Sequence, residues 1–284
     1  MTLVIGKNSQ TAKTLIELGF EAIYLSTQDL NLLDIDQIST KLSNYEFKII
    51  INLAAYNNVE KAEDDKNAFI VNHQAVSEIS NFCQHNNCLL IHISSDYVFD
   101  GVHGSYTEED LCNPINEYGK SKLFGEEAIR DILSEHVIIR TSWLYSHFNT
   151  PNNFLFKVKQ LINSGKEISG ADDVFGSPTS TLSLAKGILN VVDAYQNKQI
   201  NYGTFHFADL GRVSRYKFIK EIALQYSLKN SLQLNAILTA KSSDFIMNAP
   251  RPLDTSLKSK KFMDMYNYTF REWDDCLLDV INKI

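Results

Sequence analysis

A tyrosine and a lysine spaced for one helix face are well suited to acid–base chemistry. Tyr118 and Lys122 stand four residues apart at the start of a predicted helix, so their side chains share a face. A free phenol titrates near pH ~10, and an adjacent ammonium favours the phenolate and brings the tyrosine pKa toward neutrality. We therefore predict that Lys122 tunes Tyr118 as an acid–base group. A Tyr-x-x-x-Lys pair alone also fits an ordinary surface helix.

A hydroxyl and a carboxylate stand directly after a predicted strand. Ser95 and Asp96 follow the aliphatic run Leu89–Ile93, and parallel sheets place reactive groups at the carboxyl ends of their strands. A serine hydroxyl at such a position can donate a hydrogen bond to an oxygen that gains charge during a reaction. We therefore predict that Ser95, Tyr118 and Lys122 form one catalytic set.

The elements that would position this set follow a regular order. Short aliphatic runs alternate with segments of helical periodicity over about 140 residues. Because the runs are continuous, they are typical of strands buried on both faces of a sheet. The predicted strands are Thr2–Ile5, Ala22–Leu25, Ile49–Leu53, Leu89–Ile93 and Val137–Arg140. The alternation predicts β-α-β units and a Rossmann-like, doubly wound parallel sheet of the α/β class.

The chain after Arg140 predicts a second, smaller part. A further strand is predicted at Thr204–Ala208, and the predicted helices are Phe154–Ile162, Thr181–Tyr195, Tyr216–Tyr226 and Phe270–Ile281. We expect residues 1–142 and 172–207 to form a dinucleotide-binding Rossmann domain. Residues 143–171 and 208–284 would form an interleaved, mainly helical substrate-binding domain.

Composition narrows the class of protein. The chain has 284 residues, of which 44% are hydrophobic and 21% charged, which is typical of a globular protein. The net charge of −7 argues against a protein that neutralises nucleic-acid phosphates. No apolar run reaches the roughly 18–20 residues of a membrane span, and no signal-peptide pattern is present. We expect a cytoplasmic protein without nucleic-acid or membrane partners.

One group of metal-ligating residue types, Cys83, His85, Cys88 and His92, suggests zinc as an alternative. Their spacing matches no standard zinc pattern, and C-x-x-C pairs are absent from the chain. The run Asn72–Cys88 instead fits a helix followed by a strand. We therefore predict no metal site.

The loop after the first strand is the expected place for a phosphate-binding turn. The segment Gly6–Ala12 keeps only the first glycine of a G-x-G-x-x-G pattern. Small residues at Ser9 and Ala12 leave room for a close backbone approach, although serine lacks the access of glycine to positive φ. An ordinary strand-to-helix turn remains the alternative for this segment.

Linked motifs run through nearly the whole chain. They are Gly6–Ala12, Ile51–Tyr56, Val59–Glu63, Val71–Asn72, Ser95–Gly101, Tyr118 with Lys122, Arg140–Tyr145, Asn152–Phe154, Gly176–Thr179 and Arg251–Pro252. In type, order and spacing the chain resembles the extended short-chain dehydrogenase/reductase superfamily, and within it the dTDP-4-dehydrorhamnose reductase family.

The resemblance implies a reaction and a role for each catalytic residue. NADPH, or sometimes NADH, would deliver hydride to the C4 keto group of dTDP-4-dehydro-L-rhamnose. Tyr118 would protonate the developing alkoxide, Ser95 would polarise the carbonyl, and Lys122 would tune Tyr118 and hold the nicotinamide ribose. In the family the Ser95 position is commonly threonine, and serine keeps the hydroxyl.

The resemblance also implies two sets of binding residues. The cofactor set is Gly6, Ser9, Gln10, Thr11, Asn31, Leu32, Ala54, Ala55, Tyr56, Tyr118 and Lys122. The substrate set is Ser95, Asp96, Trp143, Asn153, Pro178, Thr179 and Arg251. Arg251 is the expected diphosphate partner, because the guanidinium fork suits phosphate oxygens. Simple packing is the alternative for Trp143 and Pro178.

Departures from the family pattern lie mainly at the cofactor. Ser9 and Ala12 replace glycines, Asn57 replaces a usual threonine, and Ser26 and Thr27 stand where relatives often carry an acid or an arginine. The choice between NADPH and NADH therefore stays open. Two alternatives also stay open: a reductase of another 4-keto nucleotide sugar, and a non-catalytic binding or regulatory subunit on the same fold. Homodimer formation is left open as well.

Overall fold

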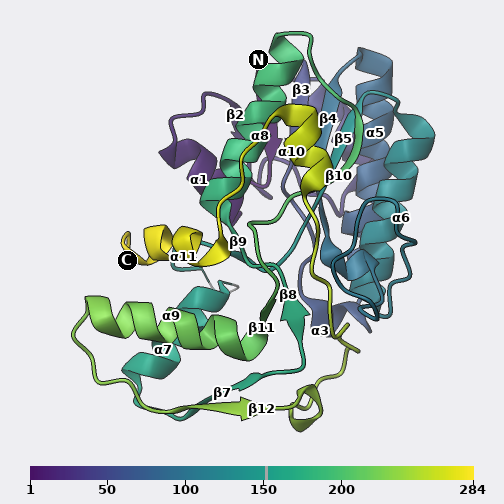
Figure 1. Ribbon diagram of the computed structural model, residues 1–284. Helices are drawn as coiled ribbons and strands as arrows, with labels where there is room; N and C mark the ends of the chain where they lie inside the picture. Colours follow the sequence, from purple (N-terminus) through teal and green to yellow (C-terminus); the bar gives the residue numbers. More distant parts are fainter. Residues whose placement is uncertain (151–152) are drawn as a thin grey trace.

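A six-stranded parallel sheet forms the centre of the computed structural model, which describes residues 1–150 and 153–284 (Figure 1). Its strand order is β10-β5-β4-β3-β1-β2. The strands are β1 (Thr2–Ile5), β2 (Ile23–Leu25), β3 (Ile49–Asn52), β4 (Leu89–Ser95), β5 (His136–Thr141) and β10 (Gly203–His206). The predicted doubly wound α/β fold is confirmed, and Ser95 is the last residue of β4 rather than the residue after it.

The continuous aliphatic runs arise because helices cover both faces of the sheet. On one face, Leu3 and Ile50 pack against α2 (Ile35–Leu42), α5 (Ala75–Asn86) and α6 (Glu117–Ile132). On the other face, Val4 and Ile51 pack against α1 (Gln10–Glu17) and α8 (Thr181–Gln196). Neighbouring residues in one strand point to opposite faces, so most positions of these strands are apolar, and Asn52, His92 and Arg140 are among the buried polar exceptions.

Short elements complete the first half of the chain. The predicted helix before Cys88 is preceded by α3 (Val59–Ala62), α4 (Asn67–Phe69) and a π-helical turn at Ile70–Gln74. A 3₁₀ turn at Asp96–Val98 follows β4. Cys83 and Cys88 are buried in the core between the sheet and α5, and His92 lies within β4. Of the described helices, none has the length and apolar composition needed to cross a membrane.

A second hydrophobic core lies below the sheet in Figure 1. It is built from α7 (Phe154–Asn163), α9 (Arg215–Lys229) and α11 (Trp273–Ile281), with Phe218 and Trp273 at its centre. Three short strand pairs border it: β7 (Ile168–Ala171) with β12 (Ile237–Ala240), β8 (Phe175–Gly176) with β11 (Val213–Ser214), and β6 (Leu144–Tyr145) with β9 (Thr179–Ser180). The predicted helices of this region are present within a few residues of their expected ends.

One helix of the predicted substrate-binding part packs against the sheet of the other part. Helix α10 (Lys260–Tyr266) was not predicted, and it lies in the segment expected to bind substrate. Its Phe262 packs edge-on against Phe205 and Phe207 of the sheet region, with ring centroids 6.0 and 4.9 Å apart. Contacts with Phe205 in β10 and with Phe207 after it therefore hold α10 against the sheet. The division at residues 207 and 208 stays a prediction.

The order of the strands reverses at β1, which lies between β2 and β3 in the sheet. The chain leaves β1 toward β2 on one side and enters β3 on the other side of β1. In doubly wound sheets, ligands bind outside the carboxyl ends of the strands at such a reversal. The loops after β1, β3, β4 and β5 are therefore the loops that can meet a ligand.

Candidate active site

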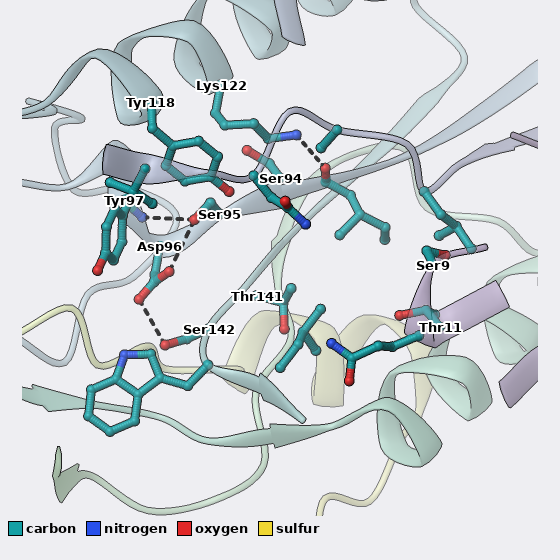
Figure 2. A pocket seen from close by; sticks show the side chains of 18 of the residues that line it. Ser9, Thr11, Ser94, Ser95, Asp96, Tyr97, Tyr118, Lys122, Thr141 and Ser142 are labelled. Carbon is teal, nitrogen blue, oxygen red and sulfur yellow. Dashed lines mark hydrogen bonds between the residues drawn. The ribbon is translucent and has the colours of Figure 1, made fainter. Parts of the chain in front are cut away.

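One cavity of about 650 Å³ lies at the carboxyl ends of these strands. It extends from Ser9 and Thr11 at the start of α1, past Lys122 and Tyr118 of α6, to Trp143 beyond β5 (Figure 2). The predicted catalytic residues Ser95, Tyr118 and Lys122 all line it, as do Ser9, Gln10, Thr11, Ala55, Asp96 and Trp143 from the predicted binding sets. The fold thus brings residues from five separate loops and helices to one cavity.

The loop before α1 needs one glycine for its backbone. Gly6 has φ +95°, and a Cβ built there would lie 2.8 Å from the Ala54 nitrogen. Ser9 has the ordinary values φ −66° and ψ 154°, and its hydroxyl caps α1 by accepting from the Ala12 nitrogen at 3.1 Å. Serine can therefore adopt the backbone conformation that position 9 requires, and the loop needs no second glycine there. The free N–H groups and dipole of the α1 N-terminus suit an anionic group.

Replacing Gly6 by alanine should therefore harm folding and cofactor binding together. The added methyl would collide with the backbone of the loop after β3, at a φ that L-residues rarely adopt. We expect the free energy of unfolding to fall by about 2 kcal/mol or more, measured by urea denaturation. Gly19→Ala is the control, because Gly19 also has positive φ but a Cβ there meets nothing within 4 Å. An equal loss in both variants would contradict the close-approach argument.

Helix α6 places Tyr118 in its first turn. Asn116 caps the helix by accepting from the Gly119 nitrogen at 2.8 Å. A Cβ at Gly119 would lie 2.2 Å from the carbonyl oxygen of Tyr97, so glycine lets α6 approach the end of β4 closely. As a result the phenol hydroxyl of Tyr118 points toward Ser95 (Figure 2).

The pKa of Tyr118 moves in the direction opposite to the one predicted. It is raised to about 12, chiefly by burial and also by Asp96 and Tyr97, while the hydrogen bond with Ser95 acts to lower it. Lys122 does not bond to Tyr118; its Nζ donates to the Ile93 carbonyl oxygen at 2.8 Å. Without ligand, Tyr118 is a protonated phenol across the neutral range, which is the form that can donate a proton.

Lys122 is buried in the wall of the same cavity, with 1% of its surface exposed. Burial lowers the pKa of this ammonium to about 8, and the carboxylate of Glu126 opposes the shift. Glu126 is itself held by Arg140, whose Nη2 lies 2.7 Å from its Oε2. Lys122 can therefore change protonation state near neutral pH.

Asp96 gathers the hydroxyl groups at the end of β4. It accepts from Ser95 at 3.1 Å, from Ser142 at 2.8 Å and from Thr255. Burial raises the pKa of Asp96, while these hydrogen bonds and the charge of Arg215 lower it. The Tyr97 nitrogen donates to the Ser95 oxygen at 3.2 Å, which fixes the orientation of the serine (Figure 2).

Four residues of the predicted cofactor set besides Gly6 lie outside the cavity lining. The Asn31 side chain bonds to Asp34 and to the Leu33 nitrogen. Leu32 is buried in the core, so its side chain cannot reach a ligand. The Ala54 nitrogen donates to Asn52, and the Tyr56 hydroxyl donates to Asp65. Binding by Asn31, Ala54 and Tyr56 stays a prediction, and Leu32 could take part only through its backbone.

Four residues of the predicted substrate set also lie outside the lining. Asn153 caps α7 and donates to the carbonyls of Ser146 and Phe148, while its neighbour Asn152 lies outside the described residues. Pro178 and Thr179 are buried at β9. The Arg251 guanidinium is paired with Glu60 and donates to the Tyr97 hydroxyl at 3.3 Å. The expected diphosphate partner is therefore already engaged in an ion pair.

An arginine that the sequence analysis did not single out lies beside Trp143. The Arg215 guanidinium stacks on the Trp143 ring, 3.4 Å from its centroid, and lies 4.7 Å from that of Phe154. Burial lowers its pKa to about 10, and the nearby Tyr97 and Asp96 oppose that shift. Within the described part of the chain, this side chain forms neither a hydrogen bond nor an ion pair. Like Arg251, it lies outside the cavity lining, and its contact with the lining residue Trp143, rather than a motif, makes it a candidate.

Two threonine hydroxyls in the cavity wall also lack partners. The Oγ1 atoms of Thr141 and Thr150 are buried without a hydrogen bond to any described residue. Thr141 ends β5 and belongs to the quoted Arg140–Tyr145 motif, which was the available signal for it. Buried hydroxyls normally find partners, so these two indicate a place where a polar ligand group fits.

Comparison with known proteins agrees with this geometry. The family model described as "RmlD substrate binding domain" matches residues 1–284. A curated dTDP-4-dehydrorhamnose reductase from Aggregatibacter actinomycetemcomitans is 29% identical over 277 residues, which cover 95% of this chain and 92% of that protein.

Solved structures show the same relationship. The crystal structure of a dTDP-4-dehydrorhamnose reductase from Clostridium acetobutylicum has a TM-score of 0.89 and 28% identity, covering 99% of this chain and 98% of that one. The Bacillus anthracis dTDP-4-dehydrorhamnose reductase, solved in complex with NADP, has a TM-score of 0.90 and 27% identity, covering 100% and 99%. Because the family model spans every residue from Met1 to Ile284, the chain belongs to the RmlD substrate binding domain family.

Proposed function

We propose that the protein reduces the C4 keto group of a dTDP-4-keto-6-deoxy sugar, namely dTDP-4-dehydro-L-rhamnose, with NADPH or NADH. The observation that carries this proposal is the convergence of Ser95, Tyr118 and Lys122 on one wall of the cavity that begins at the α1 N-terminus. Relatives that carry the reductase name cover nearly the whole chain. We further propose that the enzyme works in the cytoplasm.

The cavity fits a dinucleotide. The α1 N-terminus offers N–H groups to a pyrophosphate, Lys122 can hold a ribose hydroxyl, and the unpartnered Thr141 hydroxyl offers a hydrogen bond near the catalytic residues. When bound, NADPH or NADH supplies the hydride. The remaining chemistry is the delivery of one proton to the carbonyl oxygen that becomes an alkoxide.

Tyr118 supplies that proton. Its O–H bond breaks as a new O–H bond forms on the substrate oxygen, and the high pKa of the buried phenol keeps it protonated until then. Ser95 donates a hydrogen bond to the same oxygen, for which its hydroxyl hydrogen must turn from Asp96 toward the substrate. Asp96 is a positioning residue, because it holds the hydroxyls of Ser95, Ser142 and Thr255 in place.

Arg215 is the cation that we propose for the substrate diphosphate. Among the described residues its guanidinium has no hydrogen-bond acceptor, and it lies 3.4 Å from the Trp143 ring centroid and 4.7 Å from that of Phe154, where Asp96 and Tyr97 act on its charge. Arg251 is committed to Glu60. A planar, pre-oriented guanidinium suits paired phosphate oxygens.

Replacing Arg215 by glutamine should raise KM for the nucleotide sugar by roughly 10- to 100-fold, because a charge-assisted hydrogen bond contributes about 1.5–3 kcal/mol. Steady-state kinetics with varied sugar substrate measure this change, and Kd for NADPH should stay the same. Arg212→Gln is the control, since Arg212 is paired with Asp254 and half-exposed. If Arg251→Gln raises KM while Arg215→Gln does not, Arg251 is the diphosphate partner instead.

An assay across 4-keto nucleotide sugars tests the function itself. Purified protein with NADPH or NADH should convert dTDP-4-dehydro-L-rhamnose faster than keto sugars of other configuration. Faster turnover of another 4-keto sugar would favour that alternative substrate. Absence of both turnover and nucleotide binding by the folded protein would favour a non-catalytic binding or regulatory role. Light scattering with the same sample would test for a homodimer.

A further inference from the structure

Two buried side chains, Asn52 and His92, form a series of contacts that ends at Lys122. Asn52, the last residue of β3, is in register with His92 of β4. The Asn52 Nδ2 atom lies 3.2 Å from His92 Nδ1, and His92 Nε2 lies 3.4 Å from Lys122 Nζ. All three side chains are fully buried. Their contacts connect the loop after β3 to the catalytic lysine.

The direction of each hydrogen bond in this chain follows from one backbone group. The Ala54 N–H donates to Asn52 Oδ1 at 3.1 Å, so the amide turns its Nδ2 toward His92. An amide nitrogen only donates, and therefore His92 Nδ1 must accept. Burial lowers the pKa of His92 well below its usual value, so the ring is neutral. Its single proton then resides on Nε2, facing Lys122.

An N–H that faces Lys122 needs an acceptor, and an ammonium has none. The uncharged amine can accept from His92 Nε2 and still donate to the Ile93 carbonyl oxygen at 2.8 Å. We propose that Asn52 and His92 are positioning residues that present Nε2–H to Lys122 and so favour its uncharged amine. Protonation of Lys122 would force the His92 proton onto Nδ1, opposite the Asn52 amide donor, or would break the contact.

Other titratable groups around Lys122 act less directly. Tyr118 and Glu126 lie on the same helix, and the Glu126 carboxylate would favour an ammonium. That carboxylate is shared with Arg140 of β5 at 2.7 Å and with Arg130 at 3.0 Å. Its negative charge is therefore largely balanced by two guanidinium groups.

Lys122 would take up a proton after Tyr118 has lost its own, and this step rests on the proposed function. When Tyr118 has given its proton to the substrate oxygen, a phenolate remains near Lys122. The uncharged fraction of Lys122 can then take up a proton from an acid of the buffer, because the new negative charge favours the ammonium. By opposing the ammonium, His92 and Asn52 would thus make proton uptake by Lys122 depend more strongly on the negative charge that the reduction leaves on Tyr118.

Nitrogen NMR tests the proton positions without substrate or cofactor. Long-range ¹H–¹⁵N spectra of the full-length chain labelled at histidine distinguish the two neutral tautomers. At about pH 9, above the Lys122 pKa of about 8, we expect the Nε2–H tautomer for His92. His206 is the internal control, because its Nδ1 faces the Tyr106 carbonyl at 3.1 Å and its Nε2 faces Arg140 at 3.5 Å, which requires the opposite tautomer. His92→Gln and His206→Gln identify the two signals, and an Nδ1–H or doubly protonated His92 would overturn the proposal.

The pH dependence of activity supplies a second test. Glutamine at position 92 can turn its oxygen toward an ammonium, so His92→Gln should raise the pKa of Lys122 in the kcat/KM profile by about one pH unit. His206→Gln should leave that pKa in place, and thermal unfolding checks that both variants fold. An unchanged profile in His92→Gln would overturn the proposal. Absence of reductase activity in the unmodified enzyme would instead refute the proposed function, while the NMR result would still stand.

Discussion

Replacing Tyr118 by phenylalanine is expected to lower kcat by about 10³-fold, because the variant loses the group that we propose protonates the substrate oxygen. The phenyl ring keeps the edge-on contact with Tyr97, at 5.8 Å between centroids, so folding should be little affected. Stopped-flow or steady-state NADPH oxidation measures the loss. Circular dichroism and thermal unfolding verify the fold of the variant.

Tyr97→Phe is the matched control for this variant. Tyr97 lines the same cavity, and its hydroxyl accepts from Arg251 at 3.3 Å, away from the proposed proton transfer. We expect kcat to fall less than about tenfold, as is usual when one neutral hydrogen bond is lost. Comparable losses in Tyr97→Phe and Tyr118→Phe would show that general disturbance of the cavity, rather than proton donation, explains the effect.

Replacing Lys122 by methionine is expected to lower kcat/KM by about 10²-fold or more while making the folded protein more stable at pH 7. The burial that lowers the pKa of Lys122 to about 8 also means that folding at neutral pH must bury an ammonium. That burial costs about 3 kcal/mol at 1.36 kcal/mol per pH unit. Methionine removes this cost but leaves the Ile93 carbonyl and His92 without a partner, so we expect a net gain of about 1 kcal/mol.

The lowered pKa of Lys122 also determines how the free energy of unfolding changes with pH. Below about pH 8 the lysine is protonated in both the folded and the unfolded states, and its destabilising effect is complete. Between about 8 and the ordinary value of 10.5, the unfolded state binds more protons than the folded state, so the free energy of unfolding rises with pH. Denaturant titrations should show this rise in the wild type and not in Lys122→Met.

Lys120→Met is the matched control for the lysine variant. Lys120 lies on the same helix, but its exposed ammonium pairs with Glu117. Exposed pairs of this kind contribute little to stability, so both activity and the free energy of unfolding should stay close to the wild-type values. A Lys122→Met protein that is less stable than wild type at pH 7 would contradict the assigned cost of burying the charge.

The catalytic set could be predicted from the sequence because its signals are local. Tyr118 and Lys122 share a helix turn, and Ser95 ends a strand whose aliphatic pattern is plain. The sheet could be predicted for the same reason, since each strand carries its own apolar run. These features depend on residues within a few positions of one another.

Features that depend on distant partners could not be predicted. Arg251 fits a phosphate partner by residue type, but its ion pair with Glu60 joins segments far apart in the chain. Arg215 becomes a candidate only because α9 carries it onto the ring of Trp143. The direction of the Tyr118 pKa shift was wrong because burial, a tertiary property, outweighs the effect expected from a nearby lysine.

The loop Gly6–Ala12 shows why a match to the G-x-G-x-x-G pattern does not by itself describe the structure of the turn. Positive φ is required at Gly6, whereas Ser9 adopts an ordinary conformation and caps α1 with its hydroxyl. The missing glycines therefore change how the turn is built without removing the helix N-terminus that an anion needs. Backbone angles, which the sequence does not state, separate these two cases.

Transfer of deuterium from the cofactor tests the central proposal most directly. Purified enzyme would be mixed with NADPH carrying deuterium at the nicotinamide C4 position and with dTDP-4-dehydro-L-rhamnose, and the product examined by NMR and mass spectrometry. We expect dTDP-L-rhamnose with one deuterium at C4 of the sugar, formed in equal amount to the NADP⁺ released, and almost none with Tyr118→Phe. Unchanged keto sugar with the folded wild-type protein, or product without deuterium at C4, would contradict it.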